Sequence, residues 1–121
     1  EITDFGNKRV LFGYDAAGDL VAVTAVPQGA DPIVRGRTTW YTYSTGHTNE
    51  DANHNLLTIT PPGLTTPTLI NLYGTDPTSF TFDRLIGQRG GVPRLGCCGV
   101  ASVGSGLTIS YEQLGVTPGA G

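Results

Sequence analysis

The chain has 121 residues, with seven basic and ten acidic side chains and a formal net charge of −3. A slightly acidic chain is not attracted to a polyanion, so the charge balance opposes a nucleic-acid-coating role, and we expect no nucleic-acid partner. The length fits a single domain over residues 1–121, and a hydrophobic content of 38% excludes general disorder.

The N-terminal third predicts a β-hairpin. Residues 8–14 (KRVLFGY) and 19–26 (DLVAVTAV) are expected to be half-buried strands, whose successive side chains point to opposite faces of a sheet. Asp15-Ala16-Ala17-Gly18 connects them and ends in glycine, a residue that tight turns favour. The longest apolar run here is strand-sized, so no membrane span is expected.

Further strand patterns follow at spacings of roughly ten residues. Prolines at 27 and 32 interrupt the chain before the next strand, and residues 45–55 (TGHTNEDANHN) lack apolar periodicity, which predicts an exposed loop. The expected strands are 38–44, 56–60, 68–73, 79–83 and 107–111, and short helical turns are expected at 82–88 and 112–114.

About seven short strands with little helix predict an all-β fold. The expected architecture is a single antiparallel β-sandwich or small barrel. Residues 1–6 are expected to form an extended N-terminal arm, and residues 116–121 a C-terminal tail that would fray unless something holds it.

The sequence carries no recognisable catalytic motif. The glycine spacing from Gly13 to Gly18 lacks the lysine and hydroxyl of a phosphate loop, and Ser102 lacks the first glycine of a G-x-S-x-G elbow. His47, Asp51 and His54 are metal-ligand types, but glycine and asparagines around them disfavour the helix that would align them. We therefore expect a protein that is not an enzyme, with no cofactor, metal or catalytic residues.

Cys97 and Cys98 are the two cysteines of the chain and are direct neighbours. A bridge between them would be strained, because adjacent Cα atoms lie closer together than a disulfide prefers. Two buried thiols are one interpretation, and bridges to cysteines of neighbouring subunits are the other. Under either interpretation we expect no ordinary disulfide bond within the domain, so packing or contacts with other chains must stabilise the fold.

These observations favour a structural subunit of an ordered assembly. Threonine- and glycine-rich strands with arms at both ends suit a repeating shell, so the expected function is a virion coat or capsid-decoration protein of a phage. The expected partners are copies of the chain and another structural protein, and the expected location is virion or extracellular. The candidate interface residues are Ile2, Phe5, Trp40, Tyr41, Tyr43, Arg89, Arg94, Cys97, Cys98 and Val116.

Two alternatives remain open at this point. One is a subunit of an extracellular filament, in which a terminal segment of one chain completes the sheet of the next. The other is a secreted carbohydrate-binding module, in which Trp40, Tyr41 and Tyr43 stack against sugar rings.

Overall fold

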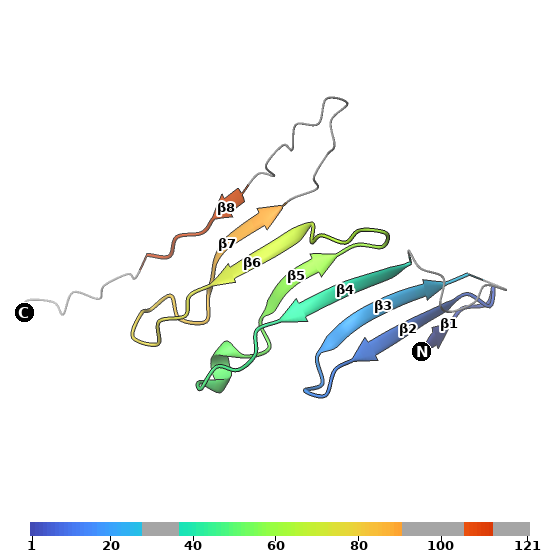
Figure 1. Ribbon diagram of the computed structural model, residues 1–121, viewed down its shortest axis with the longest axis horizontal. Helices are drawn as coiled ribbons and strands as arrows, with labels where there is room; N and C mark the ends of the chain where they lie inside the picture. The colour runs from blue at the N-terminus through green and yellow to red at the C-terminus, as the bar shows by residue number, and fades with distance from the viewer. Residues whose placement is uncertain (28–36, 91–105, 113–121) are drawn as a thin grey trace, which may run out of the picture.

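The computed structural model describes residues 1–27, 37–90 and 106–112 of the protein. These residues form one antiparallel sheet of eight strands, in which each strand pairs with the next along the chain (Figure 1). The strands are β1 (Ile2–Thr3), β2 (Arg9–Tyr14), β3 (Leu20–Val26), β4 (Thr38–Tyr43), β5 (Leu56–Thr60), β6 (Leu69–Tyr73), β7 (Leu85–Gly90) and β8 (Gly106–Thr108). A short 3₁₀ turn, η1 (Glu50–Ala52), lies between β4 and β5.

The expected hairpin at the N-terminal end is confirmed as β2 and β3. The Asp15 carboxylate accepts hydrogen bonds from the backbone N–H groups of Ala17 and Asp19, both at 2.9 Å, and so closes the turn. Gly18 has a φ of 92°, the left-handed region that glycine adopts at little cost. The strands expected at 38–44, 56–60 and 68–73 are also present, as β4, β5 and β6.

The segment between β6 and β7 differs from the prediction. Residues 79–83 do not form the expected strand, and their ladder contact is an isolated bridge between Gly74 and Phe82. The helical turn expected at 82–88 is wrong, because Leu85–Gly90 is the strand β7 and pairs with β6 over its whole length. Tertiary pairing overrides local preference here. The turn expected at 112–114 lies partly outside the described residues.

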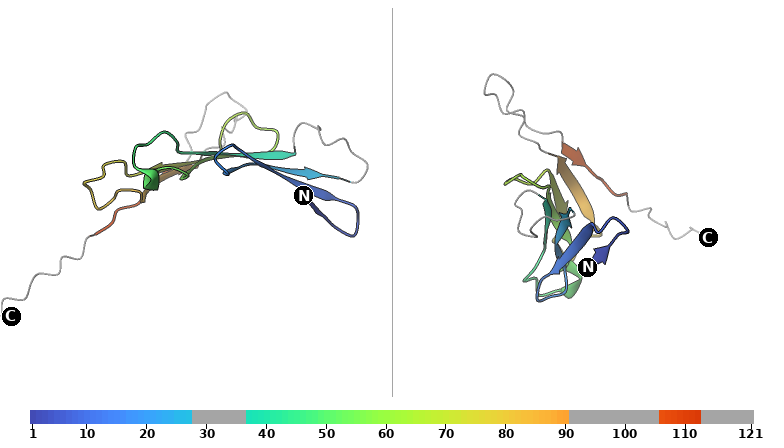
Figure 2. Two further views of the ribbon diagram at one scale, coloured as in Figure 1. Left: turned by 90° about the horizontal axis from the view of Figure 1, so that it is seen from below. Right: turned by 90° about the vertical axis from the view of Figure 1, so that its right-hand side faces the viewer.

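The prediction of an all-β antiparallel fold is confirmed, but the expected sandwich or barrel is not what the described residues form. They make one layer of eight strands, and the sheet is not closed, because β1 and β8 lie at opposite edges. Figure 2 shows this layer edge-on as a bent, twisted sheet. Alternation along a strand shows that its two faces differ, and it does not show whether the same chain covers either face.

The N-terminal segment joins the sheet through the short strand β1. Ile2 pairs with Val10 and Thr3 with Arg9, so β1 extends the sheet of its own chain. The turn that follows is closed by Asp4, whose carboxylate accepts a hydrogen bond from the Lys8 backbone N–H at 2.8 Å. The C-terminal tail at 116–121 lies outside the described residues.

Candidate assembly interface

One face of the sheet, which we call the threonine face, is lined by hydroxyl groups and a few large side chains. Directly opposed residues of an antiparallel pair share a face, so the register identifies its members. They include Thr24, Thr38, Thr42, Thr58, Trp40, Ile70 and Arg89. Threonine hydroxyls bond each other across the strands, Thr24 to Thr38 at 2.9 Å and Thr42 to Thr58 at 2.6 Å.

The opposite face, which we call the apolar face, carries hydrophobic side chains from edge to edge. The same register runs from Ile2 in β1 to Leu107 in β8. Between them lie Val10, Phe12, Val23, Tyr41, Ile59 and Leu69. The strands contain two charged residues, Arg9 and Arg89, and both lie on the threonine face.

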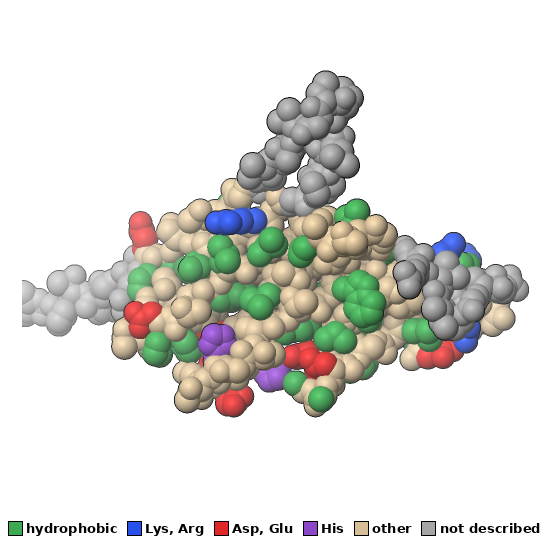
Figure 3. All heavy atoms as spheres, in the orientation of Figure 1, with side chains coloured by type: hydrophobic (Ala, Val, Ile, Leu, Met, Phe, Trp, Pro, Cys, Tyr) green, Lys and Arg blue, Asp and Glu red, His purple; other side chains and the backbone are tan. Residues whose placement is uncertain are grey.

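Neither face has an ordinary hydrophobic core against it. Among the described residues the buried hydrophobic side chains are Val26, 3% exposed, and Ala52, 7% exposed, and no large side chain is fully buried. Large apolar side chains remain open on both sides, including Trp40 at 53% and Leu107 at 58% exposure. Figure 3 shows such side chains spread over several strands of one face. A single layer in this state presents far more open apolar surface than a finished domain does.

The structure separates the aromatic residues of β4. Trp40 pairs with Ala22 on the threonine face, whereas Tyr41 pairs with Ile59 on the apolar face. Tyr43 is held at the end of β4, where its hydroxyl donates a hydrogen bond to the Leu20 carbonyl at 2.9 Å. Burial raises the pKa of Tyr43, and the negative charge of Asp19 raises it further. A sugar platform on one face can therefore not include both Trp40 and Tyr41.

The other predicted interface residues lie at the margins of the sheet. Ile2 belongs to the apolar face at the β1 edge, and Phe5 projects fully exposed from the turn between β1 and β2. Arg89 lies in β7, exposed on the threonine face opposite Ile70. Arg94, Cys97, Cys98 and Val116 fall outside the described residues, so the role of the cysteine pair stays a prediction.

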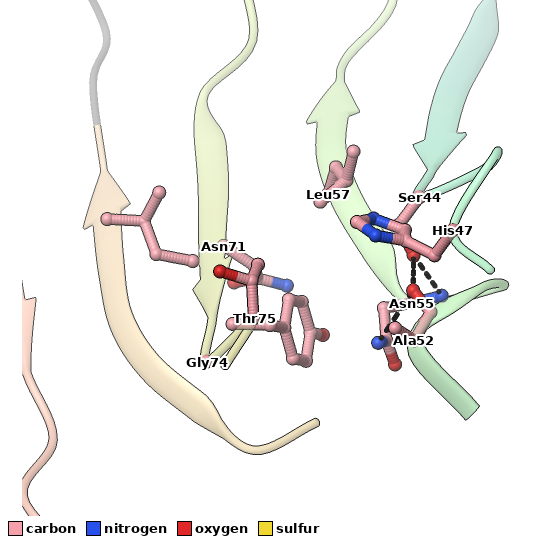
Figure 4. Close-up of a pocket in the computed structure, with 10 residues that line it drawn as sticks. Ser44, His47, Ala52, Asn55, Leu57, Asn71, Gly74 and Thr75 are labelled. Atoms are coloured by element: carbon pink, nitrogen blue, oxygen red, sulfur yellow. Dashed lines mark hydrogen bonds between the residues drawn. The ribbon is translucent and has the colours of Figure 1, made fainter. Parts of the chain in front are cut away.

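The connections at one end of the sheet enclose a hollow of about 200 Å³. Figure 4 shows Ser44, His47, Ala52 and Asn55 on one side of it and Asn71, Gly74 and Thr75 on the other. The buried Ser44 hydroxyl donates to the Ala52 carbonyl at 2.6 Å and accepts from the Asn55 backbone N–H at 3.1 Å. No buried side-chain nitrogen or oxygen of the described residues lacks a hydrogen-bond partner, so this end of the sheet is internally satisfied.

The two histidines of the loop at residues 45–55, His47 and His54, make different contacts. His54 Nδ1 lies 2.9 Å from the Asp19 carboxylate, which joins the loop to the turn between β2 and β3. That hydrogen bond, together with the negative charge of Asp19, raises the pKa of His54. His47 instead lines the hollow. Within residues 1–27, 37–90 and 106–112, no three His, Cys, Asp or Glu side chains cluster as metal ligands.

Sequence reasoning missed most of the apolar face as an interface. The sequence pattern predicts only that Phe12, Val23, Ile59 and Leu69 lie in strands. A signal is present in the sequence, because the expected strands at 38–44, 56–60, 68–73 and 107–111 carry no charged residue, although a strand that faces water on one side usually carries charged residues there. No helix of the described residues has the length and apolarity of a membrane span.

Comparison with known proteins finds no family model that matches the chain, no similar curated protein and no similar solved structure.

Proposed function

We propose that the protein is a non-enzymatic structural subunit of an ordered assembly, of the kind that builds a virion coat or a capsid-decorating layer. One observation carries the proposal: the described chain is one sheet thick and leaves large apolar side chains open on both sides. Burying such surface is the main favourable contribution to folding and association. Copies of the chain, or a companion structural protein, supply the missing layer.

The choice of a shell over another kind of assembly rests on an analogy between this fold and the subunits of repeating shells. A thin, bent sheet suits a shell, because neighbouring copies can cover one of its faces and its edges at the same time. The location that goes with this proposal is a virion or the extracellular space.

A filament joined by strand addition is the second candidate, and the sheet edges favour it. β1 and β8 each have one side without a neighbouring strand among the described residues, and open edges accept strands from other chains. With eight alternating strands, β8 of one copy runs antiparallel to β1 of a copy in the same orientation. Such pairing would continue the sheet without inverting its faces.

Light scattering coupled to size-exclusion chromatography, over a wide range of protein concentration, tests the proposal. We expect species larger than one chain that grow with concentration, and electron micrographs of these species distinguish closed shells from filaments. A persistent monomer at every concentration contradicts both candidates. In that case a glycan array on wild type and Trp40→Ala tests the carbohydrate-binding alternative, because Trp40 is exposed on the threonine face.

A further inference from the structure

The two faces of the sheet differ in how readily a second copy can cover them. Arg89 and Arg9, which lies 4.0 Å from the Glu1 carboxylate, project from the threonine face, so two copies apposed through that face would have to bury these charges in a contact that excludes water. Within the described strands, the apolar face carries no charged residue. A face without charge meets its own copy without like-charge repulsion, and an interface between identical copies related by a two-fold axis brings the same surface together from both sides.

The two side-chain amides of the apolar face, Asn71 and Gln88, are already hydrogen-bonded within the chain. Asn71 donates its side-chain amide hydrogen to the Leu56 carbonyl at 2.9 Å, and its side-chain oxygen accepts from the Gln88 amide at 3.0 Å. Covering a satisfied amide pair costs far less than covering amides that still need water. This part of the face can therefore be covered without leaving an unpaired hydrogen-bonding group.

The area of the apolar face is close to the area that each partner buries in a standard protein–protein interface. Strands lie ~4.8 Å apart and rise ~3.3 Å per residue, so a sheet of eight strands, each about five residues long, offers roughly 600 Å² of flat area. Protruding side chains enlarge that area toward the roughly 800 Å² per partner of a standard interface.

We propose that the apolar face is the site at which two copies of this chain pack face to face, and that the threonine face stays open to solvent in the pair. This inference rests on the proposed assembly function and specifies its first contact. The product is a two-layer β-sandwich whose sheets lie ~10 Å apart. Each copy then supplies the second layer that the sequence led us to expect within one chain.

Trp40 provides a test that needs no substitution. It is the one tryptophan of the chain and lies on the threonine face, 53% exposed. Acrylamide quenching of its fluorescence is measured through a dilution series, alongside the mass from sedimentation velocity. We expect quenching to stay unchanged while the protein associates, and a fall in quenching on association would overturn the inference while leaving the assembly function intact.

Two lysine substitutions at matched exposure distinguish the faces. Phe12 on the apolar face and Ile70 on the threonine face are both 37% exposed. Phe12→Lys is expected to raise the dissociation constant about 100-fold or more, because it places a charge in the buried contact of both copies. Ile70→Lys is expected to leave the dissociation constant within about threefold of wild type.

Ala25→Lys is a second variant of the apolar face, in case Phe12→Lys does not fold. Ala25 is exposed and lies opposite Val10. Circular dichroism checks that each variant is folded. If the folded apolar-face variants still associate, or if Ile70→Lys dissociates the protein, the inference fails although the assembly stands. Association through sheet edges gives the first of these results. If wild type never associates, the proposed function fails as well.

Discussion

The connections at one end of the sheet are hydrogen-bonded and partly buried within the chain, whereas the faces of the strands remain half exposed. The turn between β2 and β3, the loop between β4 and β5 and the segment between β6 and β7 all lie at this end (Figure 1). Hydrogen bonds within the chain close this end, and Ser44 and Ala52 are buried there. The strands pair well along their edges, yet their faces remain half open. Among the described residues, local structure is therefore complete, whereas hydrophobic burial is not.

This contrast predicts two separate classes of variant. Substitutions in the connections should lower the stability of a single chain without altering association, and substitutions on the apolar face should do the reverse. The following changes test the first class, from the largest expected effect to the smallest.

Gly74→Ala should have the largest effect. A Cβ atom at Gly74 would overlap the Thr81 backbone carbonyl oxygen, and backbone cannot move aside as a flexible side chain can. We expect a loss of about 3 kcal/mol in the free energy of unfolding, measured by urea denaturation at fixed protein concentration. Gly106→Ala is the matched control, since its nearest neighbours would lie at 3.8 Å. Equal stability of the two variants would contradict the tight closure of this segment.

Ser44→Ala should cost about 2 kcal/mol, because it removes the partner of the Asn55 backbone N–H and leaves the Ala52 carbonyl without its short hydrogen bond. Thr45→Ala, at the exposed neighbouring position, should change stability by less than about 0.5 kcal/mol. Sedimentation velocity on the folded variant should show wild-type association. If Ser44→Ala weakened association as much as it lowers stability, the result would contradict the claim that the connections act on stability alone.

Tyr43→Phe should cost about 1 kcal/mol through loss of the hydrogen bond to the Leu20 carbonyl. Tyr14→Phe controls for removing a tyrosine hydroxyl from an exposed side chain. Thermal unfolding of both variants measures the difference. An unchanged unfolding midpoint in Tyr43→Phe would show that this hydroxyl does not hold β4 to β3.

The contact between His54 and Asp19 should give the smallest effect, visible as a dependence of stability on pH. The pKa of His54 is raised above its usual 6.5 in the folded chain, so the pair stabilises fully below the unfolded-state pKa. Its contribution is lost as pH rises through the folded-state pKa. His54→Asn should abolish this pH dependence while tolerating the backbone φ of 65°, and His47→Asn should retain it. Urea denaturation at several pH values measures it, and an unchanged pH profile in His54→Asn would contradict the pairing.

The sequence identified the strands better than their surroundings. β2 to β6 contain many β-branched and aromatic residues, so local chemistry is enough to find them. β7 contains two glycines and a charged residue, and its strand structure comes from pairing with β6 rather than from its own pattern. The register that assigns Trp40 and Tyr41 to opposite faces follows from alternation alone.

The candidate site was less accessible to sequence reasoning. The partnership of His54 with Asp19 spans 35 residues, and no local spacing indicates it. The apolar face depends on cross-strand register from β1 to β8, which is a property of the assembled sheet. Whether a second layer belongs to the same chain is likewise not encoded in period-two alternation, and this is why a complete sandwich was expected where the described residues form a single layer.

The most direct test of the account is the urea-unfolding midpoint of the wild-type chain, measured over about a hundredfold range of protein concentration. If copies of the chain complete the burial of the sheet, stability should rise with concentration, by up to about 2.7 kcal/mol over that range for a dimer. A midpoint independent of concentration, together with cooperative unfolding of a single chain, would contradict the central claim that this sheet needs a partner.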